Sequence, residues 1–259
     1  MSTEVLHLPR YQELSDAELM AWSPEEFADK MIERSHLFAS HFFHVDGWKV
    51  VEQDEESKRQ GLAEFALRMA WREFWNGVHP PSKQIVMLEH VPEDIDIRIR
   101  LAQQIIDEVN HQRIWSQWVK KYGGNPRIQD YKVADDVKKT FQVTTGNEDP
   151  AMIAATLQCA GEVIVPYLFG FGRMNPDENI VHRCLPADLS EDIEKRIVLE
   201  EPRHIAVGRD IIIKYCGDAN KRRSLLLNQI RKIDAGLPKF IYDVSLLGAE
   251  RVAPLPVVA

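Results

Sequence analysis

The sequence predicts an all-α protein. Nearly every segment repeats its apolar residues with the period of a helix, and no segment alternates apolar and polar residues convincingly, as a strand would. Helix start and stop signals separate these segments. A length of 259 residues and a hydrophobic content of 44% are sufficient for one large core, and no linker or internal repeat divides the chain. We therefore expect a single all-α domain over residues 1–259.

Strong start signals define the first two expected helices. Ser15 would cap a short helix that continues through Trp22. The run Ser23-Pro24-Glu25-Glu26 combines a capping serine, a proline at the first helical position and a glutamate three residues after the serine. The helix that starts there is expected to reach Phe43, since Asp46-Gly47 favours a turn. Both helices would belong to an N-terminal extension, residues 1–53.

Proline and glycine residues separate the other expected helices. In chain order, these helices span residues 54–76, 92–122, 130–141, 150–171, 190–216 and 220–247. Gly77 and Pro80-Pro81 would end the first of them, Gly123-Gly124 would end the second, and Pro150 would begin the most apolar one. Residues 54–216 are expected to form the main bundle, with 220–247 as an additional C-terminal helix. The tail after Arg251 is expected to be loose.

The composition excludes several classes of protein. Asp and Glu (40) outnumber Lys and Arg (32), and the net charge is −8, so neither a nucleic acid nor an anionic membrane is an expected partner. Three Cys are too few for a disulfide framework. The apolar run 151–171 contains Gln158, Glu162 and Pro166, which makes it a poor membrane span. Since residues 1–10 show no basic segment followed by an apolar one, a cytoplasmic protein is expected.

Two of the expected helices carry ionisable residues in the middle of an apolar stripe. Glu108 and His111 interrupt the stripe of helix 92–122, and Glu201 and His204 interrupt that of helix 190–216. Residues three apart project from one side of a helix, within a single turn. Each Glu-x-x-His pair is therefore expected to point into the core.

Two further glutamates lie on apolar stripes. Glu162 stands in helix 150–171 without a basic neighbour, and Glu73 continues the stripe of helix 54–76. A buried charge without a partner is costly, and a metal ion would supply the missing positive charge. The alternative is an internal network of ion pairs and hydrogen bonds without a metal. A third Glu-x-x-His match, Glu33 and His36, shares a polar face and is expected to face solvent.

One glutamate from each of two helices, with Glu-x-x-His from each of two others, resembles the ligand pattern of the ferritin-like di-iron carboxylate superfamily. The resemblance covers about residues 54–216 and holds in chain order. It implies a ferritin-like four-helix bundle with additional N- and C-terminal helices, and a centre of two iron ions, or of one manganese and one iron. The implied ligands are Glu73, Glu108, His111, Glu162, Glu201 and His204. Glu108 and Glu201 are the candidates to bridge the two ions.

An acidic residue precedes each motif glutamate. In many oxygenases of this superfamily such a carboxylate receives the N–H of the ligand histidine on the opposite helix. The resemblance therefore implies that Asp107 pairs with His204 and that Glu200 pairs with His111. The alternative is that both acids are simply exposed on the flank of their helices.

Two ligand positions have alternatives in the sequence. Glu64 could take the place of Glu73, although nine residues of rotation put it on the opposite face of the helix. Pro202 must remove one backbone hydrogen bond and bend or bulge its helix. Such a defect could shift the register so that Glu200 becomes the ligand in place of Glu201.

The function implied by the resemblance is O2 activation. A reduced di-iron centre would oxidise a small organic substrate by hydroxylation, epoxidation or N-oxygenation; phenylacetyl-CoA and benzoyl-CoA epoxidase subunits and arylamine N-oxygenases are the nearest functional types. A substrate pocket is expected one turn from the ligands, at Ala66, Met69, Gln104, Ala155, Gln158, Phe169, Ile205 and Gly208. The small residues among these would leave room beside the metals.

Two other functions stay open at this stage: a ferroxidase or peroxide-handling ferritin-like protein, and a metal-free structural subunit of an oxygenase complex. The sequence contains no flavin, nicotinamide or iron–sulfur motif. An oxygenase would therefore need an external electron donor, such as a reductase or a ferredoxin. A homodimer is a further assembly that the resemblance allows.

Overall fold

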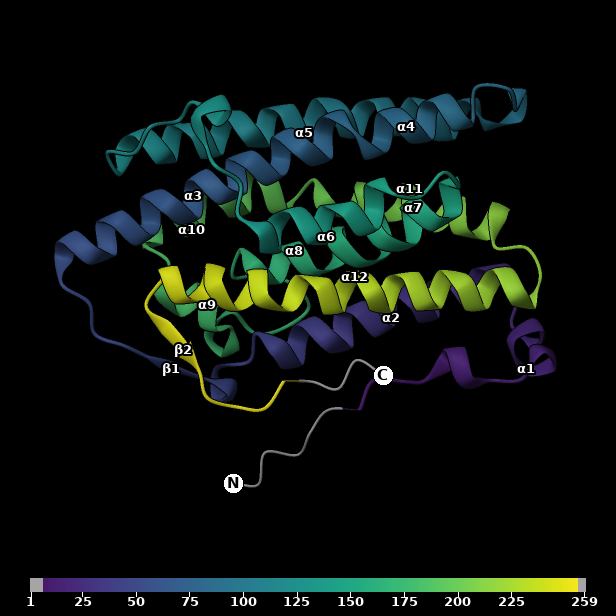
Figure 1. Ribbon diagram of the computed structural model, residues 1–259, viewed down its shortest axis with the longest axis horizontal. Coiled ribbons are helices and arrows are strands. Elements are labelled where there is room, and N and C mark those ends of the chain that lie inside the picture. The colour runs from purple at the N-terminus through teal and green to yellow at the C-terminus, as the bar shows by residue number, and fades with distance from the viewer. Residues whose placement is uncertain (1–6, 256–259) are drawn as a thin grey trace.

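The computed structural model describes residues 7–255, which form an all-α helical bundle, as the sequence predicts (Figure 1). Two long helices pack along each other at the upper edge of Figure 1: α3 (Glu55–Val78) and α5 (Ile95–Lys121). The middle of the bundle contains α7 (Pro150–Thr156), α8 (Glu162–Leu168) and α11 (Glu201–Tyr215). On the far side of these from α5 pack α2 (Pro24–Phe42) and α12 (Ala219–Leu246). The middle helices are therefore covered on both sides.

The N-terminal helices begin where the capping signals predict. Ser15 caps α1 (Asp16–Ala21) and Ser23 caps α2. Each serine side chain accepts a hydrogen bond from the backbone N–H three residues later, and the glutamate at that position bonds back to the backbone of the serine. These reciprocal bonds fix the start of both helices.

The shorter helices depart from the prediction. Helix α4 (Pro80–Met87) begins at the proline pair that was expected only to end the preceding helix. Proline is tolerated there because the first N–H groups of a helix have no intrahelical acceptor. Helix α6 (Asp135–Thr145) begins and ends later than expected, and the short α9 (Ile180–Cys184) was not expected at all.

A small antiparallel sheet corrects the expectation that the chain contains no strand. β1 (Trp48–Val50) pairs with β2 (Ala249–Arg251), which brings distant parts of the chain together. The expected loose tail is also held just beyond Arg251, because the N–H groups of Val252 and Ala253 donate to the carbonyl of Gly47. Residues 256–259 of that tail lie outside the described residues. Strands of three residues are too short to show an alternating pattern.

Two of the expected helices, 150–171 and 190–216, each contain a π-helical segment; a defect was expected only in the second of them, near Pro202. Leu157–Gly161 separates α7 from α8, and Glu194–Val198 follows α10 (Ala187–Ile193) and leads to α11. In the first segment the carbonyl of Cys159 accepts hydrogen bonds from Ser35 Oγ at 2.7 Å and Gln229 Nε2 at 3.1 Å. Side chains of α2 and α12 thus donate hydrogen bonds to a backbone carbonyl of the π-helical segment.

The break near Pro202 is confirmed. Pro202 lies in the first turn of α11, directly after the π-helical segment and a turn at residues 199–200. Its missing N–H and fixed φ favour a new helix start at this point. Glu200 and Glu201 are neighbours in the sequence, but at this break their side chains contact different residues.

One stretch of the described residues, Pro150–Leu168, is long and apolar enough to cross a membrane. It comprises α7, the first π-helical segment and α8, and 89% of it is buried inside the bundle. The stretch is accordingly a core helix of the bundle, which explains its hydropathy.

Candidate metal centre

The six residues predicted as ligands come together in the interior of the bundle. Their side chains are at most 1% exposed, and they come from α3, α5, α8 and α11: Glu73, Glu108, His111, Glu162, Glu201 and His204. Two groups of three have potential ligand atoms within 4.8 Å of one another, namely Glu73, Glu108, His111 and Glu108, Glu162, His204. Glu108 belongs to both groups, as expected for a bridging carboxylate. Glu201, the other candidate to bridge, belongs to neither group but adjoins the second, with Oε2 3.3 Å from His204 Nδ1.

The ligand atoms lack the hydrogen bonds that buried polar atoms normally have. Six buried side-chain atoms at this site have no hydrogen-bond partner: Glu73 Oε2, Glu108 Oε2, His111 Nδ1, both carboxylate oxygens of Glu201, and His204 Nδ1. Leaving a buried polar atom unpaired costs about 1–3 kcal/mol. Such a cluster fits a metal centre, because oxygen and imidazole donors facing one another are what iron or manganese would bind.

The two histidines are held by the acidic residues that precede the motif glutamates. His204 Nε2 lies 3.2 Å from Asp107 Oδ2, and His111 Nε2 lies 3.0 Å from Glu200 Oε2. These are the two pairs that the resemblance implies. Both histidines therefore donate through Nε2 and present Nδ1 to the glutamates. Because Glu200 is engaged with His111 and Glu201 is the residue that faces the other glutamates, the alternative with Glu200 as ligand does not fit this geometry.

Arg203 joins these two acidic residues at the surface. Its Nη2 atom lies 3.0 Å from Asp107 Oδ2 and 2.8 Å from Glu200 Oε1, while half of its side chain is exposed. One guanidinium thus stabilises both carboxylates that orient the histidines. Arg203 was not predicted as part of the site, although its position directly before His204 is visible in the sequence.

Asp107→Asn is expected to weaken metal binding by about 10–100-fold, the usual cost of removing a group that orients a ligand histidine. The amide lacks the negative charge that favours an Nε2–H on His204 and leaves Nδ1 free. A chelator-competition titration measures the effect, with Asp188→Asn, an exposed acid of α10, as the matched control. Equal affinity in the two variants would contradict the role given to Asp107.

A buried arginine that the sequence analysis missed also enters the site. Arg72 Nη1 lies 3.0 Å from Glu73 Oε1, and Arg72 Nη2 lies 3.4 Å from Glu162 Oε2. Glu162 has no basic neighbour in its own helix, as the sequence shows, and its basic partner Arg72 comes from α3. The guanidinium also lies 5.6 Å from the ring centre of Phe169. One arginine offsets part of the charge of four glutamates, so positive charge is still missing unless protons or metal ions supply it.

Protons supply part of that charge in the metal-free protein. Burial, together with the nearby Glu108 carboxylate, raises the pKa of Glu73 to about 8. Burial and the carboxylates of Glu108 and Glu201 raise the pKa of Glu162 well above its usual range. Burial alone would lower the pKa of His111, but the carboxylates of Glu108 and Glu73 outweigh it and raise this pKa to about 9. Without a metal, these candidate ligands thus hold protons that a bound metal would displace.

These shifts predict that the metal-free protein loses stability as the pH rises. A proton on Glu73 stabilises the fold fully below the usual pKa near 4.5, and this contribution is lost as the pH rises to about 8. The contribution of His111 is lost in the same direction, from about 6.5 to about 9. Burial lowers the pKa of Lys232 to about 7, which acts in the opposite direction, so the metal-loaded protein serves as the reference. Relative to it, the melting temperature of the metal-free protein should fall by roughly 5–10 °C between about pH 5 and 9. A difference that stayed constant across this range would contradict the assignment.

Two other expectations are settled by burial. Glu64 is only partly buried and accepts a hydrogen bond from Tyr131 at 3.3 Å, away from the other glutamates, so the geometry favours Glu73. His36 was expected to face solvent but is buried, with Nδ1 3.0 Å from the Tyr167 hydroxyl. Its partner in the sequence motif, Glu33, faces solvent as expected.

Two of the residues expected to line the substrate pocket lie beside the candidate ligands. Gln104 and Gln158 are buried beside the ligands, where Gln104 Nε2 lies 3.3 Å from Glu108 Oε1 and 3.4 Å from Glu162 Oε1. Gln158 donates to Gln104 and Gln84. The small residue Gly208 does not leave open space, because a Cβ at this position would lie 2.1 Å from Gln158 Cβ. The expectation of room beside Gly208 was therefore wrong: the Gln158 side chain fills it.

The other expected pocket residues are divided between two parts of the core. One hydrophobic cluster contains Ala66, Met69 and Phe169, whereas another contains Ala155, with Ile205 packed against it. Of the helices that carry the candidate ligands, α5 and α8 contribute to both clusters, whereas α3 contributes only to the first and α11 only to the second.

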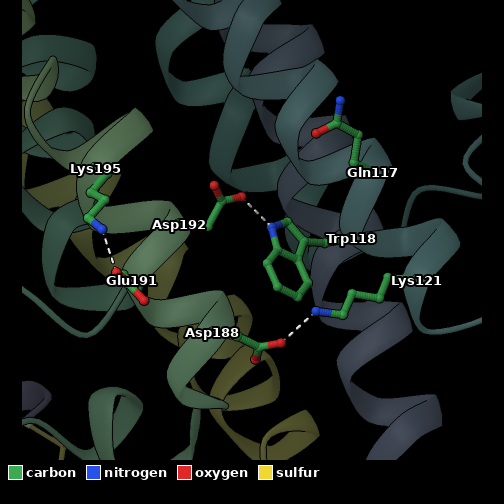
Figure 2. A pocket seen from close by; sticks show the side chains of 7 residues that line it. All are labelled: Gln117, Trp118, Lys121, Asp188, Glu191, Asp192 and Lys195. Carbon is green, nitrogen blue, oxygen red and sulfur yellow. Dashed lines mark hydrogen bonds and ion pairs between the residues drawn. The ribbon is translucent and has the colours of Figure 1, made fainter.

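A surface pocket of about 480 Å³ lies elsewhere, at the C-terminal end of α5 (Figure 2). None of the expected pocket residues lines it. Lys121 pairs with Asp188 and Lys195 pairs with Glu191, while the Trp118 indole donates to Asp192 at 2.7 Å. None of the residues that line this pocket belongs to the glutamate and histidine cluster.

Comparison with known proteins gives no family. No protein-family model matches the chain. No curated protein matches it either. The assignment of a function rests on the residues of the buried cluster.

Proposed function

We propose that this chain is a non-haem di-iron oxygenase or oxidase of the ferritin-like type, which uses O2 to oxidise a small organic substrate. One observation carries the proposal. Two Glu/His groups share Glu108, and the atoms that face one another at the site lack hydrogen-bond partners. Oxygen and imidazole donors without cysteine favour iron, or one iron and one manganese, over zinc.

In this proposal the residues around the centre have distinct roles. Glu73 and His111 would hold one ion, Glu162 and His204 would hold the other, and Glu108 would contact both, with Glu201 as a further carboxylate. When bound in the ferrous state, the two ions supply electrons for the reduction of O2. Asp107 and Glu200 keep the histidines in the orientation that exposes Nδ1.

The side chains around the site would keep bulk water away from the reaction. Trp115 is fully buried on α5, one turn after His111, and its ring lies 5.2 Å from that of Phe169. Aromatic and aliphatic side chains therefore separate the ligands from bulk solvent. A small organic substrate, an external reductase or ferredoxin as electron donor, and a cytoplasmic location complete the proposal.

A second candidate function is favoured by Arg72. This guanidinium contacts Glu73 and Glu162 without any metal, as a metal-free structural subunit of an oxygenase complex would require. The two candidates differ in what they predict for metal loading. A structural subunit would bind no iron, and it would have no use for the unpaired atoms of Glu108 and Glu201.

The proposal is tested by O2 uptake. Protein loaded anaerobically with ferrous iron, chemically reduced and exposed to O2 should consume O2 at a rate that Glu201→Ala reduces at least tenfold and that Glu191→Ala, an exposed acid, leaves unchanged. Continued turnover of added ferrous iron would identify the ferroxidase alternative instead. Absence of any iron-dependent O2 uptake would reject the oxygenase and favour the structural subunit.

A further inference from the structure

The outer face of α5 carries an apolar stripe that no other part of the described chain covers. Four of its residues are large and about half exposed or more: Ile95 (56%), Ile99 (60%), Ile106 (55%) and Val109 (49%). Ala102, also exposed, completes the stripe. The opposite face of the helix is buried and carries Glu108 and His111. Helix α5 lies at the upper edge of the molecule in Figure 1.

The spacing of these residues is that of a coiled-coil seam. From Ile95 through Ile99, Ala102, Ile106 and Val109 to Arg113, the steps alternate between four and three residues. A strict alternation of this kind defines positions a and d of a heptad and differs from the broader stripe by which a helix packs on a globular core. The seam is about 27 Å long, at 1.5 Å per residue. An exposed seam of this length fits another helix along its side.

We propose that a second copy of this chain occupies the seam, with the two α5 helices antiparallel. In an antiparallel pair related by a twofold axis near residue 104, Ala102 faces Ile106 of the second copy and Ile99 faces Val109. The small residue then lies opposite a large one, so the side chains interdigitate. The same surface serves both copies, as a twofold interface requires.

The charges at the ends of the seam select this orientation. Asp96 and Arg113 are both exposed, and neither forms an ion pair within residues 7–255. Antiparallel pairing brings Arg113 of each copy beside Asp96 of the other. Parallel pairing would instead place Arg113 against Arg113 and leave both aspartates without a partner. Charge complementarity therefore favours the antiparallel dimer of this chain.

Sedimentation equilibrium over a wide range of protein concentration tests the proposal. The wild-type chain should reach twice its monomer mass of 29.8 kDa. Ile106→Glu should raise the dissociation constant by about a hundredfold, since both copies carry the change near the axis. Leu227→Glu, at an exposed apolar position of α12, should leave it unchanged. Far-UV circular dichroism checks that each variant is folded. A wild-type chain that stays monomeric throughout would overturn the proposal.

A charge exchange tests the orientation separately. Asp96→Arg and Arg113→Asp should each raise the dissociation constant by about tenfold, because each replaces two attractive contacts by two repulsive ones. The double variant Asp96→Arg/Arg113→Asp should restore it. Failure of the double variant to restore dimerisation would overturn the antiparallel pairing. A dimer insensitive to Ile106→Glu would overturn the seam as its interface.

Discussion

Replacing Glu108 by alanine is expected to remove both metal ions, not one. Glu108 is the single residue shared by the two ligand groups, so its loss removes one of the two carboxylates from each group. After anaerobic loading with ferrous iron and desalting, the wild-type chain should retain about two ions and Glu108→Ala close to none. Glu162→Ala, which disturbs one group only, should retain about one ion. Glu64→Ala, a partly buried glutamate of α3 outside the cluster, should retain both.

The position of Glu108 is set by close packing of α3 against α5. A Cβ at Gly77 would lie 2.6 Å from Glu108 Cβ, so only glycine allows the two helices to approach at this point. The backbone of Glu108 is therefore held independently of its carboxylate, and Glu108→Ala should keep the fold. One ion retained by Glu108→Ala would show that the two groups do not share this ligand.

Replacing Arg72 by leucine is expected to destabilise the metal-free protein by about 3 kcal/mol, because it leaves Glu73 and Glu162 buried without their cation. Metal binding should then recover this loss, since the ions supply the charge that Arg72 supplied. Urea denaturation with and without metal measures both quantities. The stabilisation on loading metal should exceed that of the wild-type chain by about the amount lost in the metal-free state.

Arg68 provides the matched control for this experiment. It lies one turn earlier on α3, is equally buried and pairs with Asp243 and Asp136, which are not part of the metal site. Arg68→Leu should lose a similar free energy of unfolding, and its stabilisation by metal should equal that of the wild-type chain. If Arg72→Leu behaved in the same way as Arg68→Leu, the metal-free structural role would be supported.

The sequence was sufficient to predict features that depend on local spacing. The helical period identified the long helices, and capping residues such as Ser23 fixed their starts. The clustering of the six candidate ligands could be predicted because Glu and His interrupt apolar stripes. In a helix, the spacing of residues along the chain determines the direction in which their side chains point. The break at Pro202 followed from its missing N–H.

Features that depend on side chains meeting across helices could not be predicted. Arg72 is a basic residue and does not belong to the apolar stripe of its helix. Its long side chain reaches Glu162, which lies ninety residues later in the sequence on another helix. The small residue Gly208 predicted free space, but the Gln158 side chain fills that space. A contact between side chains of two helices cannot be predicted from the sequence of either helix alone. The π-helical segment at Cys159 depends on Ser35 and Gln229, which no local pattern connects.

The most direct test of a two-metal centre is anomalous X-ray diffraction at the iron edge from crystals loaded with ferrous iron. The account predicts two anomalous peaks per chain inside the bundle, one beside Glu73 and His111, the other beside Glu162 and His204, with Glu108 between them. No anomalous peak among these residues in fully loaded crystals, or iron bound only at the surface, would contradict it.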